Sequence, residues 1–399
     1  MAFVIVGASL AGANAAETLR AEGFTGEIVM VGEEVELPYE RPPLSKGFLL
    51  GNQALEEAFV HPAEWYQEKG ISLYLSTRAT ALDVAAKQLT LSSGEQLGYE
   101  KLLLATGARP RPFDLAGARY LRVMQDSREI KELLTEGRRV VVIGAGWIGL
   151  EVAAAGRTHG AEVTVVELDR LPLRRVLGDE LAEFYRDVHV DKGVTFHFGH
   201  SVTAADGESV TLDDGTVIAA DVLVAGVGVV PNTELAEGAG LTVDNGIVVS
   251  ESLETSAADV FACGDVASWR HPSLDTNVRV EHWENARQSG MAAARAMLGQ
   301  PVSYDWIPYF YSDQYDVGME YSGYVGRDGY DSVVYRGDPQ SREFIAFWVK
   351  GGRVLAGMNV NVWDVQDHIR ALIKAGYEGK SVDLDRLADP DAPLDGLVS

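Results

Sequence analysis

The sequence feature that most constrains the fold is a strand, a glycine turn and a helix that occur twice. Phe3 to Val6, Gly12 to Glu22 and Ile28 to Val31 predict a strand, a helix and a second strand. The first glycines of the two turns, Gly7 and Gly144, lie 137 residues apart, which is the size of one small domain. Apolar strands that alternate with helices are typical of βαβ units in a buried parallel sheet. We therefore predict an α/β fold with two Rossmann-like nucleotide-binding domains.

The second copy of this unit predicts strands at Val140 to Ile143 and Glu162 to Val166, with a helix from Leu150 to His159 between them. Each copy closes with another strand that ends in glycines. These strands are Lys101 to Gly107 in the first copy and Val222 to Gly228 in the second.

The segment from Gly246 to Asp265 contains too many predicted strands to be a linker, so we expect it to return to the first domain. Residues 1–109 and 233–307 would then form one discontinuous domain, and residues 110–232 would be inserted into it as the second. Residues 308–399 hold 13 of the 34 aromatic residues and have no glycine fingerprint. We predict that they form a small C-terminal α+β domain.

Two local patterns support this third domain. Glu343 to Val349 and Arg353 to Met358 flank the pair Gly351-Gly352, which is a hairpin signal. Asp364 to Lys374 predicts a helix, and we expect Gly376 to be its C-cap.

The first glycine turn departs at one position from the dinucleotide fingerprint, which has glycine at its first, third and sixth positions. Gly7 and Gly12 match, whereas Ser9 stands at the third position, where its small side chain still lets a pyrophosphate approach. Glu33 follows 21 residues after Gly12, where an acid accepts hydrogen bonds from an adenosine ribose. One such turn alone also occurs in unrelated α/β folds.

The second turn matches the fingerprint fully, with Gly144, Gly146 and Gly149. Its acid is Glu167, which attracts the 2′-hydroxyl of NAD and repels the 2′-phosphate of NADP. Three nearby arginines could partly reverse that preference. They are Arg170, Arg174 and Arg175. We expect NADH to be preferred.

The composition excludes several classes of partner and site. A formal charge of −25 argues against binding to nucleic acid or to anionic lipid. The single cysteine, Cys263, rules out an intrachain disulfide and an iron–sulfur or metal site built from thiolates. No metal site is expected. The first residues predict a strand with no basic leader before it, so the expected location is the cytoplasm.

Five motifs in order resemble one family over essentially the whole chain. They are LPYERPPLSKGFL at 37–49, KLLLATGARPRP at 101–112, GVGVVPN at 226–232, VFACGDV at 260–266 and YFYSDQYDVG at 309–318. The chain is similar to the NADH-dependent ferredoxin reductases of bacterial oxygenase systems, within the glutathione-reductase superfamily. This resemblance implies FAD in the first domain and NAD(H) in the second.

The resemblance also implies roles for individual residues. Asp265 would bind the ribityl chain of FAD, and Lys46, paired with Glu151, would stabilise negative charge on the reduced flavin as the catalytic pair. The FAD-binding positions are Gly7, Ser9, Ala11, Gly12, Glu33, Arg41, Lys46, Ala79, Thr106, Gly107, Arg122, Asp265 and Trp283. The NAD-binding positions are Gly144, Gly146, Ile148, Gly149, Glu167, Arg175 and Gly228. Taken alone, Lys46 would be a solvated lysine, Asp265 a helix cap and Trp283 a core residue.

The position of the cysteine decides between branches of the superfamily. Disulfide reductases carry a cysteine pair against the flavin, and the related NADH peroxidases and oxidases carry a single cysteine there. The matching stretch here, Pro38 to Leu49, contains none, and Cys263 fits a small buried residue. We therefore expect no thiol step.

The expected function is transfer of electrons from NADH through FAD to a [2Fe–2S] ferredoxin that serves an oxygenase. A local basic patch with Arg287 and Arg295, and with Tyr311 nearby, would receive the ferredoxin. Two alternatives stay open: an NADH-dependent reductase of a small acceptor, similar to monodehydroascorbate reductases, and an NADH-sensing flavoprotein that resembles apoptosis-inducing factor. Both a monomer and a homodimer are compatible with the sequence.

Overall fold

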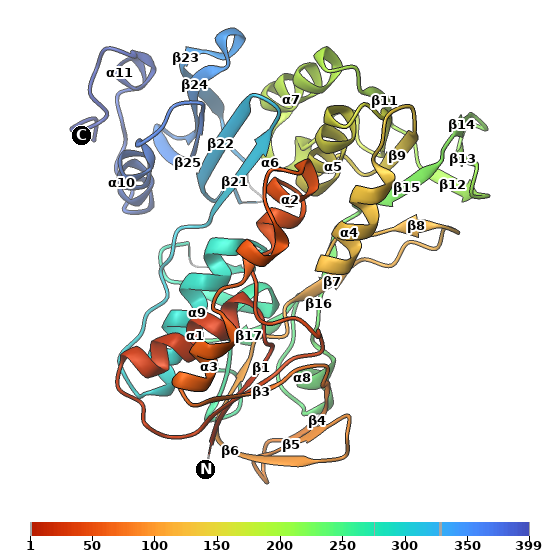
Figure 1. The fold of residues 1–399 in the computed structure, drawn as a ribbon. Coiled ribbons are helices and arrows are strands. Elements are labelled where there is room, and N and C mark those ends of the chain that lie inside the picture. Colours follow the sequence, from red (N-terminus) through yellow and green to blue (C-terminus); the bar gives the residue numbers. More distant parts are fainter. Residues whose placement is uncertain (1, 275, 327–328, 399) are drawn as a thin grey trace.

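The structure, a computed structural model, describes residues 2–274, 276–326 and 329–398. Figure 1 shows three parts, each built around a sheet: one from red, orange and teal segments, one from yellow and green segments, and a blue C-terminal part. This arrangement agrees with the predicted α/β class. Among the described residues, no helix joins enough length with enough apolar character to cross a bilayer.

The first part is centred on a parallel sheet. Strand β1 (Ala2–Val6) lies between β2 (Ile28–Val31) and β6 (Gln96–Leu104). Strand β3 (Ile71–Tyr74) pairs with β2, and β18 (Val260–Ala262) pairs in parallel with β6. A strand from residue 260 onward therefore does return to the first sheet. The domain limits given above stay a prediction.

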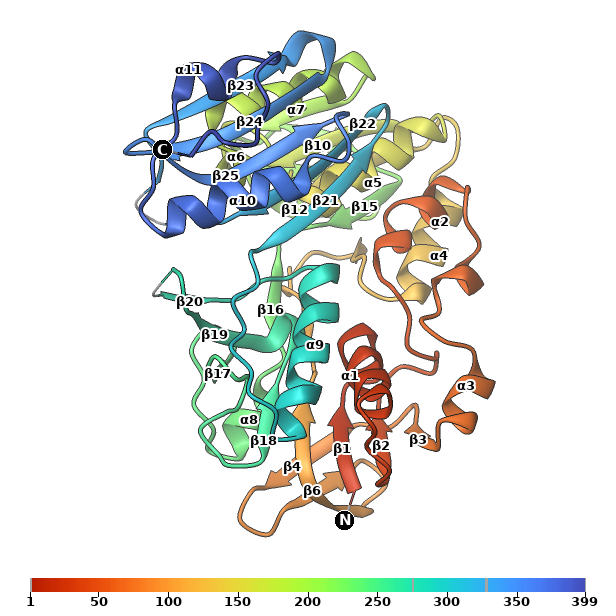
Figure 2. The same cartoon turned by 90° about the vertical axis from the view of Figure 1, so that its left-hand side faces the viewer.

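The other helices and strands of residues 2–110 and 233–307 extend or surround this sheet, which two antiparallel strands at residues 79–83 and 88–91 continue beyond β6. They are α1 (Leu10–Ala21), α2 (Gly47–Leu50), α3 (Ala63–Glu68), β4 (Ala79–Asp83), β5 (Gln88–Leu91), β7 (Ala108–Pro110), α8 (Glu234–Gly238), β17 (Ile247–Val249), β19 (Ala267–His271), β20 (Thr276–Val278) and α9 (Trp283–Met297). Figure 2 shows α1 and α9 side by side over the sheet. Their backbones can come close because Gly290 of α9 has no side chain. A Cβ there would lie 2.3 Å from the carbonyl oxygen of Ala11.

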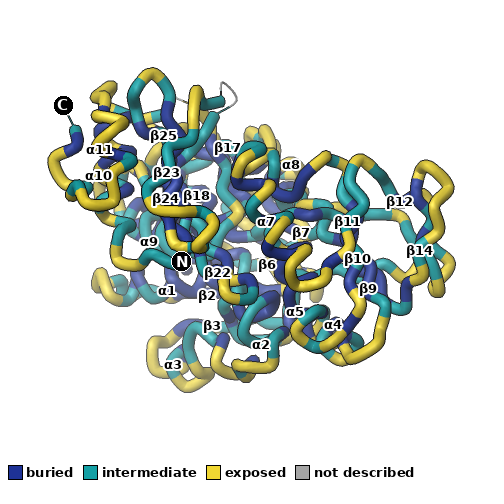
Figure 3. The backbone as a smooth tube through the Cα atoms, turned by 90° about the horizontal axis from the view of Figure 1, so that it is seen from above, coloured by how far each residue is buried: buried dark blue, intermediate teal, exposed yellow. Residues whose placement is uncertain are grey.

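The second part has a parallel sheet in the order β11-β10-β9-β15-β8. Its strands are β8 (Ala118–Arg119), β9 (Arg139–Ile143), β10 (Glu162–Glu167), β11 (Thr195–Phe198) and β15 (Val222–Ala225). Its helices are α4 (Met124–Leu133), α5 (Trp147–Thr158), α6 (Arg174–Leu177) and α7 (Asp179–Asp191). The antiparallel strands β12 (Val202–Ala205), β13 (Ser209–Leu212) and β14 (Val217–Ala219) project outward (Figure 3).

Two connections link the first and second parts. The chain leaves the first part along β7 and returns along β16 (Val229–Pro231), and these strands pair antiparallel with one another.

The C-terminal part is an antiparallel sheet in the order β21-β22-β25-β24-β23, with two helices. Its elements are β21 (Tyr309–Gln314), β22 (Val317–Gly323), β23 (Ser332–Asp338), β24 (Glu343–Lys350), β25 (Arg353–Val360), α10 (Gln366–Tyr377) and α11 (Leu384–Ala388). The hairpin at Gly351-Gly352 is present. The predicted C-cap at Gly376 is wrong, because α10 continues to Tyr377 and is capped at Glu378. Gly376 serves packing, since a Cβ there would lie 2.2 Å from the carbonyl oxygen of Val354.

Candidate functional site

The first glycine turn joins β1 to the N-terminus of α1. Gly7 has a φ of +125°, and a Cβ there would lie 2.0 Å from the carbonyl oxygen of Ala105. A Cβ on Gly12 would lie 2.1 Å from the carbonyl oxygen of Gly7. Ser9 is the N-cap residue of α1, and its side chain makes no capping hydrogen bond. The backbone N–H groups at this helix end therefore offer an anion site of the kind that holds a pyrophosphate.

The second turn, between β9 and α5, repeats this geometry. Gly144 has a φ of +95°, and a Cβ on Gly149 would lie 2.0 Å from the carbonyl oxygen of Gly144. A Cβ on Gly146, the N-cap residue of α5, would meet no atom of the described residues within 4 Å. Open space at this third position explains why a small side chain such as Ser9 is tolerated in the other copy.

The two acids differ in how they are held. Glu167 ends β10, and its carboxylate accepts the N–H groups of Ala145 and Asp169 at 2.7 and 2.8 Å. Glu33 lies beyond the end of β2, its side chain is 72% exposed, and Arg78 is 3.9 Å away. Glu167 is therefore fixed against its glycine turn, whereas Glu33 is exposed and makes only a long ion pair with Arg78.

Lys46 and Glu151, expected to form a pair, are in contact. The Nζ of Lys46 donates to Oε1 of Glu151 at 2.8 Å, and the Lys46 and Glu151 side chains are 15% and 2% exposed. The two residues lie beside α2 and on α5, so the contact joins the first and second parts of the chain. A buried carboxylate needs such compensation, because removal of charge from water is costly.

Glu151 receives two further hydrogen bonds that the sequence does not predict. The hydroxyl of Ser45 donates to Oε2, and the hydroxyl of Ser312 on β21 donates to Oε1 at 2.6 Å. Ser312 accepts from Nε2 of Gln314 at 3.0 Å, and Oε1 of Gln314 lies 2.8 Å from Nε2 of His189 on α7. A buried polar chain therefore connects all three parts of the molecule.

Burial lowers the pKa of His189 to about 4, so its ring is neutral near pH 7. With Nε2 protonated, the ring donates to Gln314.

A second charged contact joins the expected FAD positions Arg122 and Asp265. Nη2 of Arg122 donates to Oδ2 of Asp265 at 2.9 Å. Arg41 donates from Nη2 to Glu34 at 2.7 Å and from Nη1 to the carbonyl oxygen of Arg122. These residues gather at the C-terminal side of the first sheet, where α/β folds bind their ligands.

Two buried polar atoms among the expected FAD positions have no partner in the described part of the chain. They are Nε of Arg122 and Nε1 of Trp283. A buried N–H donor without a partner is rare and calls for an explanation. Together with the backbone N–H groups at the first glycine turn, these donors fit a polar cofactor such as FAD.

The Trp283 indole lies near the Lys46–Glu151 pair. Its ring is edge-on to that of Tyr311, 6.4 Å between centroids, and Lys46 Nζ is 5.1 Å from the Tyr311 ring centroid. His282 precedes Trp283, and burial followed by the charge of Lys46 lowers the His282 pKa to about 3. Aromatic and neutral groups therefore flank the lysine.

The arginines expected at a docking surface are both ion-paired on α9. Arg287 contacts Glu284 at 3.0 Å and lies 5.4 Å from the Trp283 ring centroid. Arg295 contacts Glu22, which follows α1, at 3.1 Å. Arg287 is therefore the one beside the candidate site.

Cys263 is fully buried, and burial raises the pKa of its thiol. It is the chain's single cysteine, and a buried protonated thiol is a poor nucleophile.

Comparison with known proteins identifies the family. Residues 1–290 match the model of pyridine nucleotide-disulphide oxidoreductases, and residues 309–398 match the C-terminal domain of reductases. The chain belongs to the pyridine nucleotide-disulphide oxidoreductase family. FAD and NAD(P)H are the cofactors of this family, as the sequence indicates.

Relatives within this family are named as ferredoxin reductases. The chain is 41% identical to the ferredoxin–NAD(+) reductase component of the anthranilate 1,2-dioxygenase system of Burkholderia cepacia, with 98% of each covered. It is 38% identical to putidaredoxin reductase of Pseudomonas putida, with 90% of this chain and 88% of that protein covered. The resemblance inferred from the five motifs is confirmed.

A solved structure of the covalent putidaredoxin reductase–putidaredoxin complex is also similar. It superposes with a TM-score of 0.94 at 35% identity and covers 99% of this chain and 97% of that chain. The predicted fold class is confirmed.

Proposed function

We propose that this chain is an FAD-dependent reductase that takes electrons from NADH and passes them to a [2Fe–2S] ferredoxin of an oxygenase system. The observation that carries the proposal is the similarity to ferredoxin reductases, which covers nearly the whole chain. The single cysteine is buried away from solvent, which favours direct transfer without a thiol step.

The residues of the chain divide into three roles in this proposal. The first glycine turn, Arg122 and Asp265 hold FAD, and the second turn with Glu167 holds NADH. Bound FAD supplies two-electron oxidation of NADH and one-electron delivery to an acceptor. Lys46 presents a positive charge beside the flavin site, where it stabilises developing negative charge. Glu151 orients the lysine, since both its oxygens are occupied by donors.

The remaining expected positions keep their assignment in the proposal. Ser9, Ala11, Glu33, Arg41, Ala79, Thr106, Gly107 and Trp283 belong to the FAD site, and Ile148, Arg175 and Gly228 belong to the NAD site. We further propose that the protein acts in the cytoplasm. Cell fractionation with a membrane marker checks this location.

A coupled assay tests the function. The FAD-loaded protein is mixed with NADH, cytochrome c and each of a panel of purified [2Fe–2S] ferredoxins. We expect rapid cytochrome c reduction only with a ferredoxin present, and slower turnover with NADPH. Equal turnover without any ferredoxin would contradict the proposal and indicate a small organic acceptor, for which quinone and ascorbyl radical serve as probes.

A further inference from the structure

The segment after Glu167 carries more positive charge than an NADH site needs. Arg170, Arg174 and Arg175 follow within eight residues of Glu167, between β10 and α7. Arginine is the side chain best suited to bind a phosphate, because its planar fork makes paired hydrogen bonds. Three arginines beside the adenosine acid would attract the 2′-phosphate that distinguishes NADPH.

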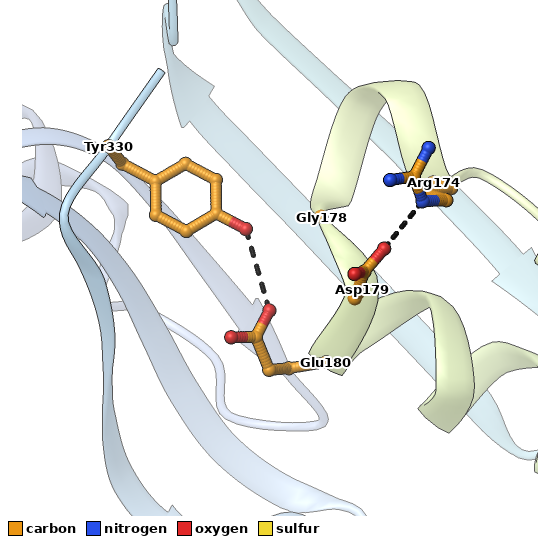
Figure 4. A pocket seen from close by; sticks show the side chains of 5 residues that line it. All are labelled: Arg174, Gly178, Asp179, Glu180 and Tyr330. Carbon is orange, nitrogen blue, oxygen red and sulfur yellow. Dashed lines mark hydrogen bonds and ion pairs between the residues drawn. The ribbon is translucent and has the colours of Figure 1, made fainter.

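Two aspartates form ion pairs with these arginines. Nε of Arg174 lies 2.5 Å from Oδ1 of Asp179, and Arg170 pairs with the other oxygen of the same carboxylate. Asp169 lies 3.3 Å from Nη1 of Arg174 and 3.4 Å from Nε of Arg175. Figure 4 shows Arg174 directed at Asp179. The hydrogen bond from Arg174 holds the pKa of Asp179 below its usual value, so this carboxylate is ionised near pH 7.

Backbone contacts fix Asp169 beside the coenzyme acid. The N–H of Asp169 donates to Oε1 of Glu167 at 2.8 Å, and its carbonyl oxygen accepts the N–H of Gly199 at 3.2 Å. The Asp169 side chain is only 17% exposed. Its carboxylate therefore stays with the arginines.

The C-terminal part of the chain approaches the start of the helix that carries Asp179. Arg174, Asp179 and Tyr330 line a cavity of about 270 Å³ (Figure 4). Gly178, between α6 and α7, has a φ of +83°, and a Cβ there would lie 1.9 Å from the hydroxyl oxygen of Tyr330. Asp179 begins α7 directly after this close contact, on the side where it pairs with Arg174.

We propose that Asp169 and Asp179 set the preference for NADH over NADPH, because they pair with the three arginines and offset the positive charge that would attract a 2′-phosphate. Together with Glu167 they balance the three positive charges, so an additional phosphate meets no net attraction. This inference rests on the proposed function and adds a specificity determinant to the NADH site.

The test compares Asp169→Asn, Asp179→Asn and the double variant. Asparagine keeps the side-chain shape but removes the negative charge. The measured quantity is the ratio of kcat/KM for NADPH to kcat/KM for NADH, with ferricyanide as acceptor. We expect this ratio to rise about tenfold in the double variant, because two negative charges near the 2′-phosphate are removed. Asp187→Asn is the matched control, since it breaks the exposed ion pair of Arg186 on α7. Its ratio should not change.

A binding measurement provides a second readout that does not need the flavin reaction. Calorimetry should show adenosine 2′,5′-bisphosphate, but not AMP, bound more tightly by the double variant. Replacement of all three arginines by alanine in that background should abolish the gain. A ratio equal to that of Asp187→Asn, or an equal loss for both coenzymes, would overturn the inference. A parent protein that oxidises neither coenzyme would instead overturn the proposed function.

Discussion

The two glycine turns share a backbone design but differ in what surrounds them. In both, glycines allow close contact between a strand and a helix, with a Cβ on Gly12 or on Gly149 placed about as near to a backbone carbonyl. Glu33 is exposed, whereas Glu167 is held by two N–H groups. The expected FAD positions include unpartnered buried donors on Arg122 and Trp283, whereas the expected NAD positions include a preformed acid, Glu167. A repeated sequence motif can therefore provide two sites with different demands.

The largest expected effect separates the two turns directly. Gly12→Ala places a methyl group 2.1 Å from a carbonyl oxygen, so the protein should lose most of its FAD and purify nearly colourless. Gly149→Ala has the equivalent clash but should stay yellow, with the KM for NADH raised about tenfold or more. The ratio of flavin to protein absorbance and steady-state kinetics measure both.

Gly238→Ala, at the end of α8 and outside both turns, is the control, because its added methyl group meets no atom within 4 Å of the described chain. Equal loss of FAD from the Gly12 and Gly149 variants would show that the two turns do not act separately.

The next effect concerns the contact between the two parts. Lys46→Met removes the ammonium group that lies 2.8 Å from Oε1 of Glu151. We expect NADH to bleach the flavin about 100-fold more slowly, because loss of one group that stabilises developing negative charge has an effect of this size. Lys46→Arg keeps the charge and should lose less. Stopped-flow absorbance measures the rate. Unchanged bleaching in Lys46→Met would remove the lysine from the catalytic pair.

A smaller effect is expected at the surface beside Trp283. Arg287→Glu should reduce turnover with a ferredoxin about tenfold while ferricyanide reduction is retained, because charge at a rim mainly affects association. Arg295→Glu should weaken ferredoxin turnover less, since Arg295 pairs with Glu22 rather than lying beside Trp283. Parallel loss of both activities in Arg287→Glu would indicate a folding defect.

The smallest effect tests how the second part is joined to the C-terminal part. Burial lowers the pKa of His189 to about 4 in the folded chain, whereas an unfolded histidine has a pKa of about 6.5. Between these two pH values the unfolded chain binds a proton at His189 and the folded chain does not. Stability is therefore lost as pH falls through this window, by about 2 kcal/mol between pH 7 and 5. His189→Gln should reduce the fall in Tm over that range by a few degrees. The same fall in both proteins would exclude His189 as the cause.

The repeated units could be predicted because their signals are local. Apolar strands, glycine turns and helices at residues 3–31 and 140–166 lie where the periodicity places them, with no end shifted by more than three residues. The prediction for Gly376 was wrong because a glycine near a helix end resembles a C-cap. The glycine is instead needed there because its backbone packs closely against Val354.

The hydrogen-bonded chain through Ser45, Ser312 and Gln314 could not be predicted. Each residue is ordinary in its own segment, and their meeting at Glu151 depends on how segments more than 100 residues apart pack together. The same holds for the arginine–aspartate contacts, where the sequence showed the charges but not their pairing.

An anaerobic titration of the FAD-loaded protein with NADH tests the central claim most directly. If electrons pass to the flavin with no sulfur relay, one molecule of NADH should bleach one flavin completely. Two molecules of oxidised [2Fe–2S] ferredoxin per flavin, each taking one electron, should then restore the colour. A flavin that needs a second molecule of NADH, or that NADH does not bleach, would contradict the account.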